Sequence, residues 1–226
     1  FNINTEQNLY YERHDAVRAY ARANALDRIV VRSTRDRIGI VAAGKTFTDV
    51  RQALRELGYD DHALNAAGIR LLKIGLLCPM DPEIVREFAH GLSDIIVVEE
   101  KRDFLERQIG RVVCDLGTPV RIVGKFDERG KPLFPIQGAM DFDFIADTLW
   151  GVLAQRVAPP EAARHRARRL ETIAKRTSVA SLRRSLNFCS GCPHNIGVRL
   201  AEGQVAWGSP GCHIFAALSP EPTRRI

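Results

Sequence analysis

Three of the five cysteines lie near the C-terminal end of this 226-residue chain, at a spacing that could form one metal centre. Cys189 and Cys192 are two residues apart, which places two thiols on one tight turn. Cys212 follows after 19 intervening residues. Gly191 and Gly211 adjoin the second and third cysteines, where glycine lets the backbone approach closely and offer N–H groups to sulfur. Three thiolates leave a four-ligand site one ligand short.

The missing fourth ligand leaves several interpretations open. A ligand beyond residue 226 would complete a 4Fe–4S cluster, which is the interpretation that we favour. His194 or His213 would instead complete a zinc site with three cysteines and one histidine. Without metal, the cysteines would be structural thiols or a redox dithiol, but the βα setting of a dithiol is absent. We interpret the other two cysteines, Cys78 and Cys114, as small core residues.

A second pattern, from Gly39 to Thr46, satisfies the phosphate-binding expression G-x-x-x-x-G-K-[ST]. Its middle residues are apolar and continue a strand, so the remaining turn is too short to wrap a triphosphate. We interpret it as a strand, a glycine turn and a helix whose first turn is capped by Thr46. Lys45 beside that helix N-terminus could still accept an anion.

A charged run, Glu99 to Arg102, directly follows an apolar strand. Strand ends in parallel sheets are where ligands and neighbouring domains meet. We expect a solvated or ion-paired turn, with an inter-domain role as the alternative, because charge runs usually face water. No partner residue supports a catalytic role.

The elements that would position these residues alternate between strand and helix. A weakly amphipathic helix is predicted over 6–26, and later helices over 46–57, 82–90, 103–113 and about 141–155. Strands are predicted at 29–31, 38–42, 69–74, 95–98 and 120–123. This alternation predicts an α/β fold, with a parallel sheet flanked by helices. Pro159 and Pro160 end the pattern.

The net charge of +6 comes from one stretch of the chain. Residues 156–184 carry a net charge of +7, and the rest of the chain carries −1. The nine basic residues of the stretch are Arg156, Arg164, Arg166, Arg168, Arg169, Lys175, Arg176, Arg183 and Arg184. A single basic helical linker explains the charge better than nucleic-acid binding does. The sequence has no apolar run long enough to span a membrane and no secretory signal, and with an odd number of cysteines this predicts a cytoplasmic location.

Residues 187–195 (NFCSGCPHN) and the later Gly211-Cys212-His213 resemble indolepyruvate:ferredoxin oxidoreductase, in its long fused bacterial form. That family lies within the 2-oxoacid:ferredoxin oxidoreductase superfamily. The resemblance continues upstream through residues 44–54, 73–75 and 97–102, so it covers nearly the whole chain.

The resemblance implies four parts: an N-terminal helical linker (1–27), a middle α/β domain like the transketolase C-terminal domain (28–156), a basic helical linker (157–187), and the truncated start of a thiamine diphosphate-binding domain (188–226). It also implies that the full-length enzyme binds thiamine diphosphate and Mg²⁺ and converts an aryl 2-oxoacid and coenzyme A to an acyl-CoA. Electrons would pass through a 4Fe–4S cluster to ferredoxin. Cys189, Cys192 and Cys212 would match three cluster ligands.

Two features depart from the family pattern. Ser209-Pro210-Gly211 stands where relatives often have Gly-Ile-Gly, and the segment lacks the acidic residue and the magnesium motif used by thiamine diphosphate. We therefore expect an internal piece of a homo-oligomeric enzyme that has no catalytic residue and no turnover of its own. Two rivals remain: a zinc-ribbon-like binding module on an α/β scaffold, and a non-catalytic assembly domain.

Overall fold

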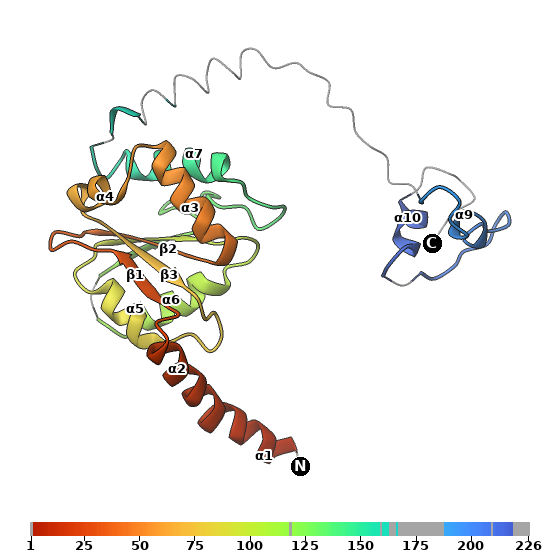
Figure 1. Ribbon diagram of the computed structural model, residues 1–226, viewed down its shortest axis with the longest axis horizontal. Coiled ribbons are helices and arrows are strands. Elements are labelled where there is room, and N and C mark those ends of the chain that lie inside the picture. The colour runs from red at the N-terminus through yellow and green to blue at the C-terminus, as the bar shows by residue number, and fades with distance from the viewer. Residues whose placement is uncertain are drawn as a thin grey trace. The chain divides into compact units, whose positions relative to one another are not determined.

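The computed structural model describes residues 2–117, 119–158, 160–162, 166, 188–208 and 210–218. The chain divides into two compact units, Phe1–Lys175 and Arg176–Ile226, which are treated separately below (Figure 1). Most of the predicted basic linker, residues 163–165 and 167–187, lies outside the described residues. The first unit is called the α/β unit and the second the cysteine unit.

The α/β unit is built on a five-stranded sheet with strand order β1-β3-β2-β4-β5. The strands are β1 (Arg28–Val31), β2 (Ile38–Ala43), β3 (Ile69–Ile74), β4 (Asp94–Val98) and β5 (Arg121–Val123). Strands β2 to β5 pair in parallel, in register from Ile38 opposite Ile69 and Asp94. The predicted α/β class is confirmed.

The first strand differs from the predicted parallel arrangement, because β1 pairs antiparallel with β3 at the sheet edge. Only residues 32–37 join β1 to β2. A parallel pair needs a crossover of a dozen or more residues, so this link is too short to return the chain to the same end of the sheet. The expectation of a wholly parallel sheet is wrong for this strand.

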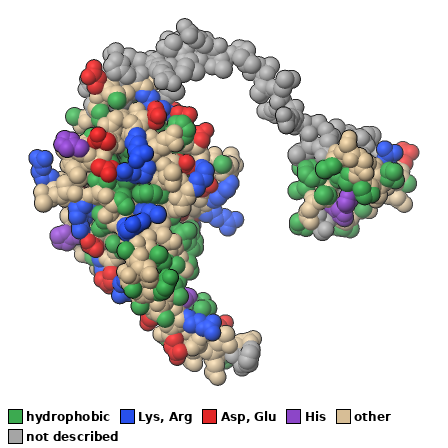
Figure 2. Space-filling model, in the orientation of Figure 1, with side chains coloured by type: hydrophobic (Ala, Val, Ile, Leu, Met, Phe, Trp, Pro, Cys, Tyr) green, Lys and Arg blue, Asp and Glu red, His purple; other side chains and the backbone are tan. Residues whose placement is uncertain are grey.

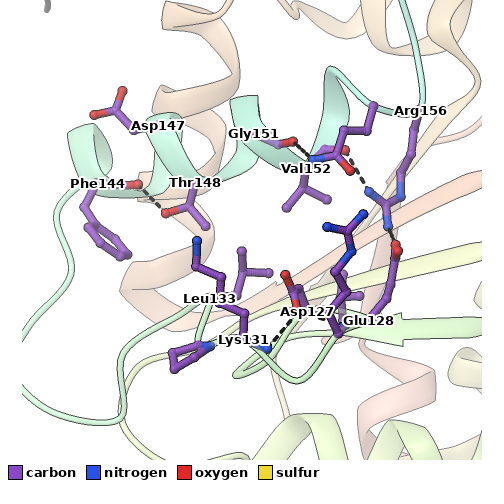
Figure 3. Close-up of a pocket in the computed structure, with 14 residues that line it drawn as sticks. Asp127, Glu128, Lys131, Leu133, Phe144, Asp147, Thr148, Gly151, Val152 and Arg156 are labelled. Carbon is purple, nitrogen blue, oxygen red and sulfur yellow. Dashed lines mark hydrogen bonds and ion pairs between the residues drawn. The ribbon is translucent and has the colours of Figure 1, made fainter.

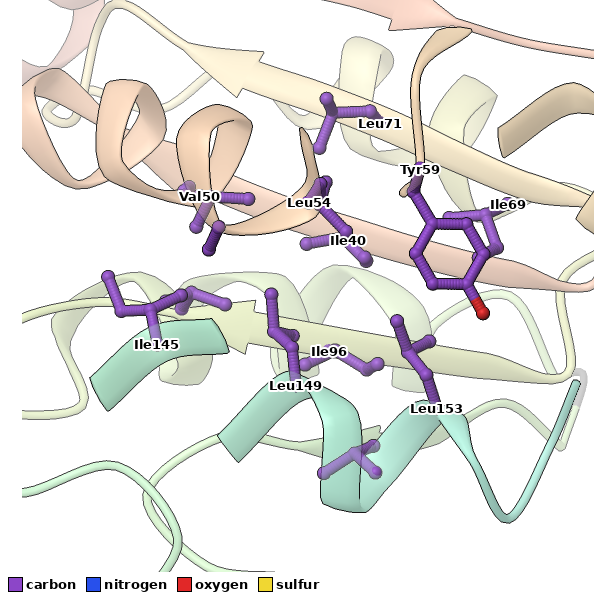
Figure 4. Packing of buried hydrophobic residues seen from close by; sticks show 14 of the residues in the cluster. Ile40, Val50, Leu54, Tyr59, Ile69, Leu71, Ile96, Ile145, Leu149 and Leu153 are labelled. Atoms are coloured by element: carbon purple, nitrogen blue, oxygen red, sulfur yellow. The ribbon is translucent and has the colours of Figure 1, made fainter. Parts of the chain in front are cut away.

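Helices cover both faces of the sheet (Figure 1). One face carries α3 (Gly44–Glu56), α4 (Asp61–Ala67) and α7 (Phe142–Leu153), and the other carries α5 (Pro82–Ala89) and α6 (Phe104–Cys114). Strand β4 is buried along its whole length, as its continuous apolar sequence predicts. Ile96 packs toward α3 and α7 in the layer that Figure 4 shows with Leu54 and Leu149.

Local capping sets the helix starts. Asp81 caps α5 by accepting a hydrogen bond from the Glu83 amide, as predicted. Helix α3 begins at Gly44 without a side-chain cap, so the predicted cap by Thr46 is wrong, and Thr46 is buried inside the first turn. Helix α4 was not predicted, although Asp60 caps it through the Ala63 amide.

The N-terminal segment is helical from residue 2, as α1 (Asn2–Gln7), a π-helical turn (Asn8–Arg13) and α2 (His14–Ala23). Only Ala21 of these residues is buried. The end of α2 is held at the start of α5 by Arg22, which pairs with Asp81 at 2.8 Å. The helix predicted over 6–26 is confirmed, with an earlier start.

The described part of the cysteine unit holds two short helices, α9 (His194–Gly197) and α10 (His213–Ala217). Val198 and Ala216 are its buried apolar residues among those described. Figure 2 shows hydrophobic side chains over much of its visible surface, and Trp207 is fully exposed. Among the described residues, no helix has the length and apolar character needed to cross a membrane.

Candidate functional site

The turn that carries Cys189 and Cys192 is closed by the backbone. The Cys192 amide donates to the Cys189 carbonyl at 3.0 Å. Gly191 between them has a φ of +75°, a left-handed conformation that glycine adopts without strain. Cys192 is half-buried, whereas Cys189 and Cys212 are exposed. Cys212 immediately precedes α10.

One histidine lies beside the half-buried cysteine, and a second histidine contacts the first. The Nδ1 atom of His194 is 3.3 Å from the Cys192 sulfur. The His194 ring stacks on Phe188, with centroids 5.8 Å apart, and meets the His213 ring edge-on at 5.7 Å. Of the two histidines that the sequence offers as alternative ligands, the structure brings His194 to Cys192 and His213 to the His194 ring.

The donor types in this unit suit a metal, since thiolates and imidazoles are the usual ligands of zinc and thiolates those of iron–sulfur clusters. The positions of these side chains, however, do not form a complete metal site. Within the part of the chain that the structure describes, no three His, Cys, Asp or Glu side chains are gathered closely enough to hold a metal ion. The assignment of Cys189, Cys192 and Cys212 as ligands therefore stays a prediction. Cys78 and Cys114, expected in the core, are exposed, so that expectation is wrong.

The apparent phosphate-binding pattern is a strand followed at once by a helix. Strand β2 runs to Ala43 and α3 begins at Gly44, so no loop remains to wrap a phosphate. The Lys45 ammonium donates to Asp49 at 2.5 Å and to the Met140 carbonyl at 3.3 Å. The interpretation as a strand and a helix is confirmed, but no separate turn lies between them and Thr46 does not cap the helix.

The charged run after β4 is bound into the fold. The Glu99 carboxylate accepts the amides of Leu105 and Glu106, at 2.7 and 3.0 Å, and so satisfies the first turn of α6. Burial raises the pKa of Glu99 above its ordinary value, although these two hydrogen bonds act in the opposite direction. The expectation of a solvated or ion-paired turn holds in part, because these charges hold the neighbouring backbone.

Lys125 is the residue at this edge that sequence reasoning missed. Its side chain is buried and donates to the Glu99 carbonyl at 2.5 Å and to the Pro135 carbonyl at 3.4 Å. Burial lowers the pKa of Lys125, while the nearby carboxylates of Glu99 and Glu106 oppose that change. A lysine directly after a strand and a glycine is the only local signal, and it does not reveal a burial that depends on distant segments.

The segment 134–140, here called the strap, is tied to the carboxyl ends of three strands. Lys101 donates to the Gly138 carbonyl at 2.5 Å, and Glu100 accepts the Met140 amide at 3.0 Å. Lys45 and Lys125 bind the two ends of the strap. The carboxyl edge, where open parallel sheets usually bind ligands, is therefore engaged with the chain's own backbone.

A family model described as the indolepyruvate oxidoreductase domain matches residues 28–177. The chain belongs to this family. The match confirms the resemblance found in the sequence, and it contains the whole described sheet. It ends before Cys189, so Cys189, Cys192 and Cys212 lie outside the matched range.

Curated relatives agree with the family assignment. The chain is 30% identical over 116 residues to indolepyruvate oxidoreductase subunit IorA of Methanothermobacter marburgensis, covering 51% of this chain and 18% of the relative. It is 32% identical over 89 residues to the subunit of the same name from Pyrococcus abyssi, covering 39% and 13%. The chain thus matches less than a fifth of the length of these relatives.

Solved structures show weaker similarity. A split-gene transketolase described as an inactive beta4 tetramer aligns with a TM-score of 0.41 at 16% identity, over 57% of this chain and 42% of that one. A 2-oxoglutarate:ferredoxin oxidoreductase from Magnetococcus marinus aligns at 0.37 and 17% identity, over 55% and 19%. The α/β assignment rests on the sheet itself and not on these alignments.

Proposed function

We propose that this chain is part of an indolepyruvate-type 2-oxoacid:ferredoxin oxidoreductase that acts in the cytoplasm. In the reaction, an aryl 2-oxoacid and coenzyme A give an acyl-CoA, CO₂ and a proton, and two oxidised ferredoxins each gain one electron. The observation that supports the proposal is the family match across residues 28–177. Thiamine diphosphate and Mg²⁺, bound by other parts of the enzyme, would supply the decarboxylation chemistry.

We assign the α/β unit a structural role in that enzyme. Its carboxyl edge is bonded to the strap through Lys45, Lys101 and Lys125, which donate to backbone carbonyls of the strap. These hydrogen bonds hold the strap against the edge. The unit would therefore pack between flanking domains of a homo-oligomer and hold them in place.

We assign the cysteine unit the metal. Cys189, Cys192 and Cys212 would bind three irons of a 4Fe–4S cluster, with the fourth ligand in another part of the protein. A cluster of this kind carries one electron at a time. The tight turn that carries Cys189 and Cys192 supports the assignment, since it places two thiols close together in the sequence and in the backbone.

The metal assignment is tested in the full-length enzyme reconstituted anaerobically with iron and sulfide. Cys192→Ser is expected to lower the iron content and the visible absorbance, because a ligand is lost. Cys114→Ser is the matched control, since Cys114 is also an exposed thiol but lies in the α/β unit. Unchanged iron in Cys192→Ser would contradict the assignment, and one zinc without iron would favour the zinc module.

The activity is tested separately by following reduction of ferredoxin with indolepyruvate and coenzyme A. The full-length enzyme is expected to be active and the 226-residue chain inactive, because the chain lacks the thiamine diphosphate motifs. Turnover by the 226-residue chain alone would refute the division of roles proposed above.

A further inference from the structure

A cavity of about 590 Å³ lies in the α/β unit, and no residue of the strap lines it (Figure 3). One wall is the turn 127–133 after β5, and the other is α7 with residues just beyond it. Its volume is within the range of small-molecule sites. The cavity has no part in the function proposed above.

The turn that forms the first wall is rigidly built. The Asp127 carboxylate accepts the backbone amides of Arg129 and Lys131, at 2.9 and 2.8 Å. The amides of Lys131 and Arg129 hold the pKa of Asp127 below its ordinary value, although the slight burial of the carboxyl acts in the opposite direction. Gly130, with a φ of +75°, completes the turn. One carboxylate thus fixes the backbone of both cationic residues.

The side chains of Arg129 and Lys131 have no acidic partner within ion-pair distance among the described residues. Figure 3 shows the Lys131 side chain reaching across the cavity toward Thr148 of α7. The third cation of the lining, Arg156, has acidic partners. Arg156 pairs with Glu128 and Asp94 and donates to the Val152 carbonyl, closing one end of the cavity.

The remaining lining contains both apolar and polar side chains. Phe144 exposes 40% of its surface, and Leu133 and Val152 form the neighbouring part of the wall. A Cβ atom added at Gly151 would meet no atom within 4 Å, so the centre of the helix wall faces open space. The cavity thus combines two unpaired cations with exposed apolar surface.

We propose that this cavity binds a small organic anion with an apolar body. The anionic group lies between Lys131 and Arg129, and the body packs against Phe144 and Leu133. The preformed turn makes the charged contacts at little entropic cost, because the Asp127 hydrogen bonds already order its backbone. Three acidic residues also line the cavity, and each has other partners: Glu128 pairs with Arg156, Asp147 lies 3.8 Å from Arg166, and Asp127, which attracts both cations, accepts backbone amides.

The proposal is tested by calorimetric titration of the 226-residue chain at low salt with four probes: phenylacetate, phenyl phosphate, acetate and inorganic phosphate. The two aromatic probes distinguish a carboxylate site from a phosphate site. Comparison with the two small ions measures how much the apolar body of the ligand adds to the affinity. At least one aromatic probe is expected to bind about tenfold more tightly than its small counterpart, because it also buries apolar surface.

Three variants locate the binding. The double variant Arg129→Ala/Lys131→Ala, which removes both cations, is expected to lower the affinity for the aromatic probe at least tenfold. Gly151→Leu keeps every charge and fills the cavity, so it is expected to weaken the same probe. Arg111→Ala removes an exposed arginine elsewhere and should leave binding unchanged. No binding by either aromatic probe, or equal binding to the double variant and Arg111→Ala, would overturn the proposal, and neither result bears on the iron content that tests the cysteine unit.

Discussion

The α/β unit and the cysteine unit are organised by different forces. In the α/β unit, two clusters of fully buried apolar side chains fill both faces of one sheet. In the described part of the cysteine unit, only Val198 and Ala216 are buried, while Ile196, Val205 and Trp207 are largely exposed. A segment with so little core needs another source of stability, such as a metal or a partner surface. Burial of apolar side chains therefore stabilises the α/β unit, whereas the cysteine unit is expected to depend on a bound metal or partner surface.

The largest effect is expected where the α/β unit buries charge. Arg70 pairs with Asp36 at 2.9 Å, with side chains 9% and 0% exposed, and also donates to the Phe88 carbonyl. Arg70→Met leaves a buried carboxylate unpaired, so the free energy of unfolding should fall by about 3–5 kcal/mol in urea denaturation.

The control for that change is Arg86→Met. Arg86 forms an exposed ion pair with Glu83, and such a pair contributes no more than about 1 kcal/mol. If the two variants lost equal stability, the buried pair would not be a distinct contributor to this unit.

Apolar substitutions compare the two units directly. Leu149→Ala removes a fully buried side chain between α7 and the sheet and should cost about 2–5 kcal/mol. Trp207→Ala in the cysteine unit removes a larger but fully exposed side chain, and its effect should lie within about 0.5 kcal/mol. Thermal unfolding followed by circular dichroism measures both. A large loss in Trp207→Ala would mean that the cysteine unit has a core after all.

A smaller effect is expected at a helix start. Asp81→Ala removes the cap of α5 and the partner of Arg22, so stability should fall by about 0.5–2 kcal/mol. Asp103→Ala is a matched control, because Asp103 precedes α6 without capping it through its side chain. Urea denaturation of both variants measures the difference, and equal losses would show that the cap contributes nothing specific.

The smallest effect concerns pH. Burial raises the pKa of Glu99, so the folded state holds its proton more tightly than the unfolded chain does. The Glu99 contribution to stability should therefore fall as pH rises from the ordinary value of 4.5 toward the raised pKa of the folded state. Glu99→Gln should flatten this part of the stability–pH curve, measured by urea denaturation between pH 4 and 7. A curve identical to that of the parent chain would contradict the assignment.

Most helices and strands could be predicted from the sequence, because their signals are local; α4 was the exception. The apolar run of β4 and the Asp81-Pro82 start of α5 lie within single segments, and the structure places both as predicted. The family resemblance could also be recognised from the sequence, because its motifs are short and keep their order along the chain. The spacing of Cys189 and Cys192 indicated one turn, and the structure contains it.

Features that join distant segments could not be predicted from local patterns and follow from how the chain packs. The direction of β1 depends on the short link to β2 and on the free edge beside β3. The hydrophobic pattern of the sequence indicates neither of these. The burial of Lys125 depends on the Glu99 carbonyl 26 residues earlier, and the strap is held by Lys101, 37 residues before Gly138. The cavity beside Lys131 likewise exists only because α7 packs across from the turn. Local patterns fix which residues form an element, whereas the ends of strands and the spaces between elements follow from packing.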